Sequence, residues 1–179
     1  MASTASPLAG AGATPSAKQQ YLNVYEEEHA RTMRVLRAFP AEQSELRPHP
    51  KLKTARELAW IFALERGLST MVMNDAFAKG GPSGETPKAP DTWDAVLAAV
   101  EKTHRDFGEF VRGLPEEKLD QTVKFFTGPK TLADVRRMDF LWFIVHDEIH
   151  HRGQFSVYLR IAGGKVPSIY GPSGDEPWF

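Results

Sequence analysis

Hydrophobic residues recur at spacings of three and four along four stretches of the chain, and this spacing is the pattern of amphipathic helices. In the first stretch Leu22, Tyr25, His29, Met33 and Leu36 form such a stripe. Because helix-period stretches dominate and strand signals are almost absent, the sequence predicts an all-α protein. The predicted helices span residues 18–39, 54–78, 91–114 and 131–162.

Capping and turn residues set the boundaries of these helices. Thr54 and Glu57 have the spacing of a capping box, in which a hydroxyl and a carboxylate each bind an otherwise unpaired backbone N–H. Thr131 and Asp134 give the fourth helix a similar start, and Pro40 ends the first helix. The remaining segments are expected to be a disordered leader (1–18), an extended connector (40–53), a loop (79–90), a mixed connector (115–130) and an irregular tail (165–179).

Four helices joined in this way predict one four-helix bundle domain covering residues 19–179. In such bundles, ligand and metal sites are built in the interior from side chains on facing helices. The run Val123-Lys-Phe-Phe126 is too short to classify and is left within the connector. Candidate chemistry is therefore sought among polar residues that lie within the apolar stripes.

Composition excludes several function classes. The chain has 22 Lys plus Arg and 23 Asp plus Glu, and a net charge of −1 gives no global attraction for nucleic acid. It has no cysteine, which removes disulfides and protein thiolates. The longest apolar run, 140–145, is far shorter than the roughly 20 residues that cross a bilayer. The N-terminus lacks the pattern of a secretory signal, so we expect a cytoplasmic protein.

The most concentrated chemistry lies between His146 and Gln154, where three histidines and two acids are close together. Residues four apart share a helix face, so His146 pairs with His150 and Asp147 pairs with His151. Either pair could bind one divalent ion from adjacent turns. The two pairs point about 100° apart, so one of them is expected to face the bundle interior. The pattern alone does not choose between them, and a solvated polar face is the alternative.

Polar residues also interrupt the stripes of the other helices. Glu65 lies in the stripe of the second helix, where a carboxylate must be paired, protonated or metal-bound. His29 and His104 lie in the stripes of the first and third helices, where histidines are more often hydrogen-bonded core residues than ligands. The sequence thus offers ligand-type side chains on all four helices.

The stretch HDEIHHRGQFSVYLRIAGGKVPSIYGPSGDE, residues 146–176, resembles the C-terminal signature of the DinB-like superfamily. The motifs Pro48-His-Pro50 and Thr54-Ala-Arg-Glu-Leu-Ala-Trp60 are similar to the lead into that family's second helix. The resemblance implies a four-helix bundle that is often dimeric, so we expect a homodimer. It also implies a divalent metal ion, held by one residue of the second helix and two of the last.

The family pattern His-x-x-x-His-Arg-Gly-Gln places its second histidine at His151 and its first at Asp147. The family's histidine on the second helix falls at Ile61, which cannot bind a metal, and Glu65 lies one turn further on. The resemblance therefore implies a site of Asp147, His151 and Glu65. His150 and His146 are supporting or alternative ligands, and His29 and His104 are more distant options.

Members of the family with a known role are thiol-dependent transferases and maleylpyruvate isomerases. The resemblance thus implies a low-molecular-weight thiol cosubstrate, activated by Ni, Zn, Mn or Fe, and a small-molecule substrate. Gln154 and Tyr158 continue the Asp147–His151 side and could bind the substrate. Arg152 could pair with a carboxylate of the cosubstrate, or form a salt bridge between helices or across a dimer interface instead. The alternative function is a non-catalytic, stress-related dimeric bundle that has lost its metal site.

Overall fold

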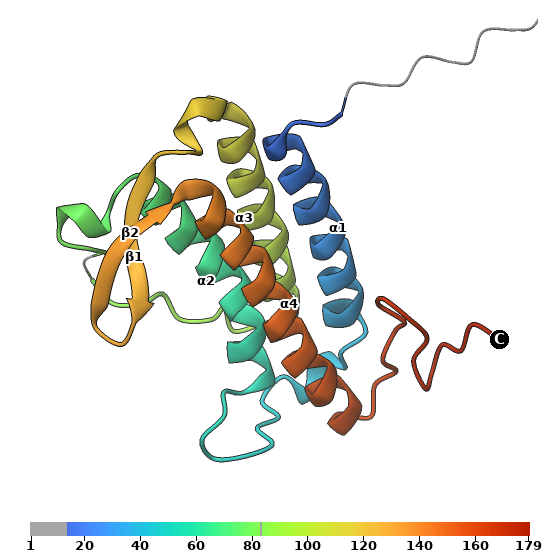
Figure 1. Cartoon of the computed structure of the whole chain (residues 1–179). Helices are drawn as coiled ribbons and strands as arrows, with labels where there is room; N and C mark the ends of the chain where they lie inside the picture. The colour runs from blue at the N-terminus through green and yellow to red at the C-terminus, as the bar shows by residue number, and fades with distance from the viewer. Residues whose placement is uncertain (1–13, 83) are drawn as a thin grey trace, which may run out of the picture.

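The computed structural model describes residues 14–82 and 84–179 and contains the predicted four long helices (Figure 1). Of the expected leader, residues 1–13 lie outside the described residues, and the first helix already begins at Ala17. Among the described residues no helix is both long and apolar enough to cross a membrane. The helices are α1 (Ala17–Arg37), α2 (Ala55–Met73), α3 (Trp93–Gly113) and α4 (Arg137–Ile161).

The helices form a bundle in which α1 and α2 are diagonal partners. Each of these two helices packs against both α3 and α4. The connector between α1 and α2 therefore passes across one end of the bundle, and the segment between α3 and α4 passes across the other (Figure 1). The predicted four-helix bundle is confirmed, and the diagonal placement brings α2 alongside α4.

A β-hairpin precedes α4, and here the sequence prediction was wrong. Strands β1 (Thr122–Gly128) and β2 (Thr131–Arg136) pair antiparallel, with Val123 opposite Val135 and Phe125 opposite Ala133. The capping-box spacing of Thr131 and Asp134 was misleading, because Asp134 pairs across the strands with Lys124 at 2.9 Å. Helix α4 consequently begins at Arg137 rather than at Thr131.

The start of α2 is as the sequence predicted. The Thr54 hydroxyl accepts from the Glu57 amide at 3.1 Å, and the Glu57 carboxylate accepts from the Thr54 amide at 2.8 Å. The helix ends at Met73, earlier than expected, since Asp75 has a φ of 61° and turns the chain away. The Asp75 carboxylate accepts from Arg137 at 2.9 Å, which ties this turn to the start of α4.

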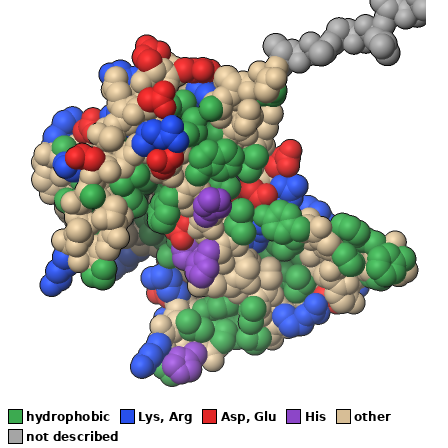
Figure 2. All heavy atoms as spheres, in the orientation of Figure 1, with side chains coloured by type: hydrophobic (Ala, Val, Ile, Leu, Met, Phe, Trp, Pro, Cys, Tyr) green, Lys and Arg blue, Asp and Glu red, His purple; other side chains and the backbone are tan. Residues whose placement is uncertain are grey.

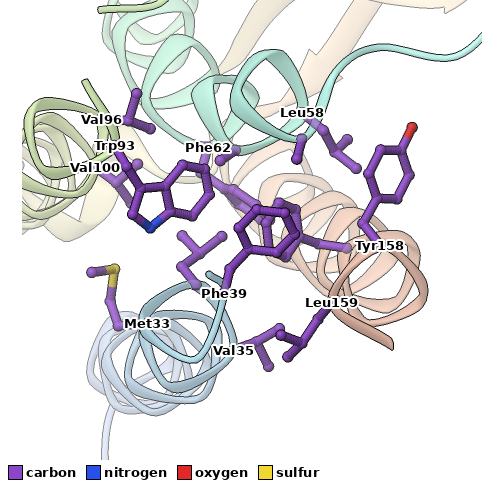
Figure 3. Packing of buried hydrophobic residues seen from close by; sticks show 14 of the residues in the cluster. Met33, Val35, Phe39, Leu58, Phe62, Trp93, Val96, Val100, Tyr158 and Leu159 are labelled. Atoms are coloured by element: carbon purple, nitrogen blue, oxygen red, sulfur yellow. The ribbon is translucent and has the colours of Figure 1, made fainter. Parts of the chain in front are cut away.

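Two apolar clusters fill the bundle, and a polar layer lies between them along every helix. Figure 3 shows the cluster nearest the connector, where Phe39, Trp93 and Phe62 meet. The second cluster, around Tyr21, Phe107 and Phe140, lies toward the hairpin. The buried residues that stand between the two clusters in the sequence of each helix are Glu28 and Thr32 (α1), Arg66 and Ser69 (α2), His104 (α3), and Glu148 and Arg152 (α4).

The chain after α4 packs closely against Leu159 and Ala38, and this contact gives a prediction about Gly164. A Cβ at this position would clash with Leu159 Cδ1 and would lie 3.1 Å from the carbonyl oxygen of Ala38. We expect Gly164→Ala to lower the free energy of unfolding by roughly 1–3 kcal/mol, because Leu159 is fully buried and has little room to move. Urea denaturation followed by circular dichroism measures this change.

Gly153 is the matched control for that substitution. It lies on the exposed side of α4, and a Cβ there would meet nothing within 4 Å. Gly153→Ala is expected to raise stability by about 0.5–1 kcal/mol through helix propensity. Equal effects at the two glycines would contradict the proposed contact at Gly164.

Candidate metal centre

Three ligand-type side chains from α2 and α4 converge where these helices pack against each other. They are Glu65, Asp147 and His151, and their ligand atoms all lie within 4.8 Å of one another. His151 Nε2 is 3.1 Å from Glu65 Oε1 and 3.7 Å from Asp147 Oδ1. Asp147 and His151 meet because they are one helical turn apart. Glu65 joins them because α2 packs against α4.

Burial and hydrogen bonding raise the pKa of two members of this triad, Glu65 and His151. The side chain of Glu65 is only 12% exposed, and burial raises its pKa to about 7, with Asp147 acting in the same direction and His151 opposing. Hydrogen bonding to Glu65 raises the pKa of His151 in turn. The Oε2 atom of Glu65 is buried and has no hydrogen-bond partner. An unpartnered carboxylate oxygen beside a second carboxylate and an imidazole suits a divalent cation.

Gln154 supports the orientation of the imidazole. Its Oε1 atom is 3.4 Å from His151 Nδ1, so a proton on Nδ1 would leave the Nε2 lone pair facing the two carboxylates. The other end of the same amide is 2.7 Å from His150 Nε2. The geometry therefore gives Gln154 a role in orienting His151, in addition to any contact with substrate.

A buried ion pair lies directly behind the triad. Arg66 on α2 donates to Glu148 on α4, and Arg66 Nη1 is 3.9 Å from Glu65 Oε2. Glu148 also accepts from the Thr32 hydroxyl at 2.7 Å. Sequence reasoning did not single out this pair. The available signal was that both charged residues fall at inward positions of apolar stripes, one turn beyond Phe62 and Ile144.

A small pocket with a volume of about 210 Å³ opens beside His151. Its walls come from the connector, α2 and α4, and Tyr158 reaches across it to donate to the Lys53 carbonyl at 2.9 Å. A larger groove of about 470 Å³ lies along α2 near Trp60 and shares Lys53 and Ile61 with it. The smaller pocket is lined by Lys51, Leu52, Lys53, Leu58, Ile61, His151, Gln154 and Tyr158.

The other candidate residues of α4 lie elsewhere. His146 and His150 are exposed on a neighbouring face of the helix, together with Phe143 and Val157. Figure 2 shows histidine and hydrophobic side chains side by side over α4. Arg152 does not line the pocket. It is buried and pairs with Glu28 at 2.7 Å, the interhelical salt bridge that was the alternative to substrate binding.

His29 and His104 stack on each other between α1 and α3, away from the triad. Their ring centroids are 3.6 Å apart and their planes differ by 8°. His104 Nε2 contacts Glu26 Oε2 at 2.9 Å. Burial lowers the pKa of His29 to about 3, with the positive charges of His104 and Arg66 acting in the same direction. Burial also lowers the pKa of His104, with Glu26 opposing, so the two histidines form a stacked pair that is neutral at neutral pH.

This pair makes the stability of the protein pH-dependent. Below its ordinary pKa of 6.5, His29 takes up a proton in the unfolded chain, whereas the folded protein resists protonation down to about pH 3. Its stabilising contribution is thus complete above pH 6.5 and is lost as pH falls toward 3. Relative to His29→Gln, the parent protein should lose roughly 1–2 kcal/mol of unfolding free energy between about pH 7 and 5.

Urea titrations of metal-free protein at several pH values measure this loss. His146→Gln removes an exposed histidine and serves as the control, whose pH profile should parallel that of the parent. Parallel profiles for His29→Gln and the parent protein would contradict the buried neutral state of His29.

The fold and the triad together define a four-helix bundle with a candidate divalent-metal centre, and comparison with known proteins gives its family. The DinB family profile matches residues 13–177, and the chain belongs to the DinB family. A curated relative, the uncharacterized protein YrdA of Bacillus subtilis (strain 168), is 26% identical over 159 residues, which cover 87% of this chain and 89% of YrdA.

Two solved structures show the same fold. A DinB-like protein from Bacillus cereus ATCC 10987 has a TM-score of 0.70 and 22% identity, and the match covers 84% of this chain and 95% of that one. YfiT from Bacillus subtilis has a TM-score of 0.64 and 15% identity, with 88% and 95% covered. YfiT is described as a probable metal-dependent hydrolase with an unusual four-helix bundle topology.

Proposed function

We propose that this chain is a divalent-metal-dependent enzyme whose metal ion is held by Glu65, Asp147 and His151. The observation that carries the proposal is the convergence of these three side chains within 4.8 Å, from two helices that are far apart in sequence. The buried Oε2 atom of Glu65 supports it, because this oxygen has no hydrogen bond and only the distant Arg66 Nη1, at 3.9 Å, as a positive neighbour. The description of the structural neighbour YfiT as probably metal-dependent is consistent with this role.

The proposed reaction is transfer of a low-molecular-weight thiol to a small electrophile. A divalent ion with three protein ligands keeps open positions and supplies Lewis acidity that lowers the pKa of a bound thiol or water. The protein has no cysteine, so the thiol would come from a cosubstrate. Gln154 Oε1, 3.4 Å from His151 Nδ1, would favour a proton on Nδ1, and the apolar side chains of Leu58 and Ile61 would limit water in the pocket.

Hydrolysis is the second candidate, and the description of YfiT favours it. The same residues would then hold and orient the metal, with water in place of the thiol. One imidazole and two carboxylates suit Zn²⁺, Mn²⁺, Fe²⁺ and Ni²⁺, whose preferences overlap for such ligands.

The test begins with protein purified without a histidine tag and analysed for bound metals. The metal-loaded protein is then assayed with a thiol and chlorodinitrobenzene, and separately with nitrophenyl esters without thiol. The transferase is supported if turnover requires the thiol, is abolished by a chelator and is restored by one metal. Glu65→Gln should lack this turnover. Turnover of the esters alone would favour the hydrolase.

A folded protein that takes up no metal and turns over neither substrate would overturn both reactions. That outcome would support the non-catalytic bundle, the alternative that the departures from the family pattern at Ile61 and Asp147 had suggested.

A further inference from the structure

The pocket beside the triad has a cationic lip formed by Lys51, Leu52 and Lys53 of the connector. Besides His151, the basic residues of its lining are these two lysines, and no carboxylate of the described residues lines it. Glu57, the nearest acidic residue in sequence, pairs with Arg47 at 3.2 Å. Lys51 and Lys53 are exposed residues that line this cavity, so the lip brings two residues with basic side chains to it.

The backbone of this lip is fixed by hydrogen bonds rather than free to move as a linker. The Leu52 amide donates to the His49 carbonyl at 2.9 Å, and the Lys51 amide donates to His49 Nδ1 at 3.1 Å. Arg47 donates to the Leu52 carbonyl at 2.8 Å. From the other side of the pocket, Tyr158 donates to the Lys53 carbonyl at 2.9 Å. Both lysines are thus carried on a backbone with a set position over the cavity.

Apart from the lip, His151 and Gln154, the pocket is lined by apolar groups. They are Leu58 and Ile61 from α2 and Tyr158 from α4, and Leu52 of the connector adds a further apolar side chain. A volume of about 210 Å³ is below the range of roughly 300–1,000 Å³ that is usual for drug-sized ligands, so the occupant must be small. Ile61, at the family's histidine position, serves here as a wall of the pocket rather than as a ligand.

We propose that this pocket selects a small organic anion, a carboxylate on an apolar body, as the electrophilic substrate. The carboxylate would lie between Lys51 and Lys53, and the apolar body would lie on Leu58 and Ile61. The far end of the molecule would then face His151. The reactive role of this anion rests on the function proposed above, whereas its binding requires only the lip and these apolar side chains.

Benzoate is the probe for this selection, with benzamide as its neutral counterpart. Metal-free, isotope-labelled full-length protein is titrated with each compound and followed by NMR. Benzoate is expected to shift the amide signals of Lys53, Ile61 and Gln154, and to bind about tenfold more tightly than benzamide, as two partly exposed ion pairs would give. Equal affinity for both compounds would overturn the proposal.

The double variant Lys51→Gln/Lys53→Gln should bind benzoate about tenfold more weakly than the parent protein. Lys118→Gln/Lys165→Gln removes the same charge from exposed positions outside the pocket and should bind benzoate as the parent does. Unchanged affinity in the first variant would contradict the role of the lip. Binding of mercaptopropionate but not of benzoate would overturn the assignment of the pocket to the electrophile.

Glu65→Gln separates this inference from the proposed function, because Glu65 does not line the pocket. Benzoate binding that persists in this variant supports the anion pocket, whether or not the metal-dependent reaction is found. Benzoate that binds only metal-loaded protein, and binds Lys51→Gln/Lys53→Gln equally well, would show that the metal holds the carboxylate. That result would overturn the anion pocket and leave the metal centre standing.

Discussion

Replacing Glu148 by leucine is expected to lower the free energy of unfolding by about 3–5 kcal/mol. The substitution removes the closer carboxylate from the buried guanidinium of Arg66 and leaves only Glu65, whose Oε2 atom is 3.9 Å from Arg66 Nη1. Arg66 would keep its bond to the Tyr25 hydroxyl and its position over the Tyr25 ring, but neither contact offers a negative charge. The Thr32 hydroxyl would lose its acceptor as well. Urea denaturation of metal-free protein measures the loss.

Arg66→Met/Glu148→Leu completes the test as a double-mutant cycle with Arg66→Met. Because removing both charges leaves no unpaired ion, the double variant should be more stable than Glu148→Leu alone. Asp106→Asn is the surface control. It breaks an exposed pair with Lys102 and should cost at most about 1 kcal/mol. A loss of that small size for Glu148→Leu would contradict the buried pair.

The buried polar layer has a consequence for how the bundle is built. Apolar contacts are less directional than ion pairs, and Arg66 with Glu148, and Arg152 with Glu28, pair only when the helices are in register. We infer that this layer fixes the register of α2 against α4 and of α1 against α4. Since Glu65 and Asp147 are each adjacent in sequence to a member of the first pair, the same register brings the triad together.

Most of the fold could be predicted because helices are encoded locally. Apolar residues at spacings of three and four located all four helices, and the Thr54–Glu57 box fixed the start of α2. The hairpin could not be predicted in this way. Its strands, of seven and six residues, do not alternate regularly between apolar and polar side chains. They are stabilised by pairing with each other and by packing of Phe125 on Phe140.

The candidate site was predictable only in part. The spacing of Asp147 and His151 is a property of any helix, and Glu65 stood out as a carboxylate within an apolar stripe. The choice between that pair and His146 with His150 depends on the rotation of α4, which packing decides. Lys51 and Lys53 carried no local signal, because the connector looks like a linker in sequence. Homodimerisation and a cytoplasmic location remain predictions.

Loss of His151 is expected to weaken metal binding by more than about 100-fold. Removing an outer group that merely orients a metal ligand costs about 10–100-fold, and His151 would be a ligand itself. Its Nε2 atom lies within 4 Å of both carboxylates, and the other two residues of the triad offer only oxygen ligands, so the variant has no imidazole ligand in the triad. Isothermal titration of metal-free, tag-free His151→Ala with Zn²⁺ or Mn²⁺ measures the affinity.

His146→Ala and His150→Ala are the matched controls, since both remove an imidazole from an exposed position of the same helix. They should leave the affinity within a few-fold of the parent value, with His150→Ala slightly weaker through its contact with Gln154. Strong losses in these two variants with none in His151→Ala would instead establish the other ligand pair. Two substitutions of Asp147 test whether this position acts as a ligand. Asp147→His restores the family spacing of two histidines, so this variant should still bind metal. Asp147→Asn replaces the carboxylate by a weaker ligand, so its metal affinity should fall.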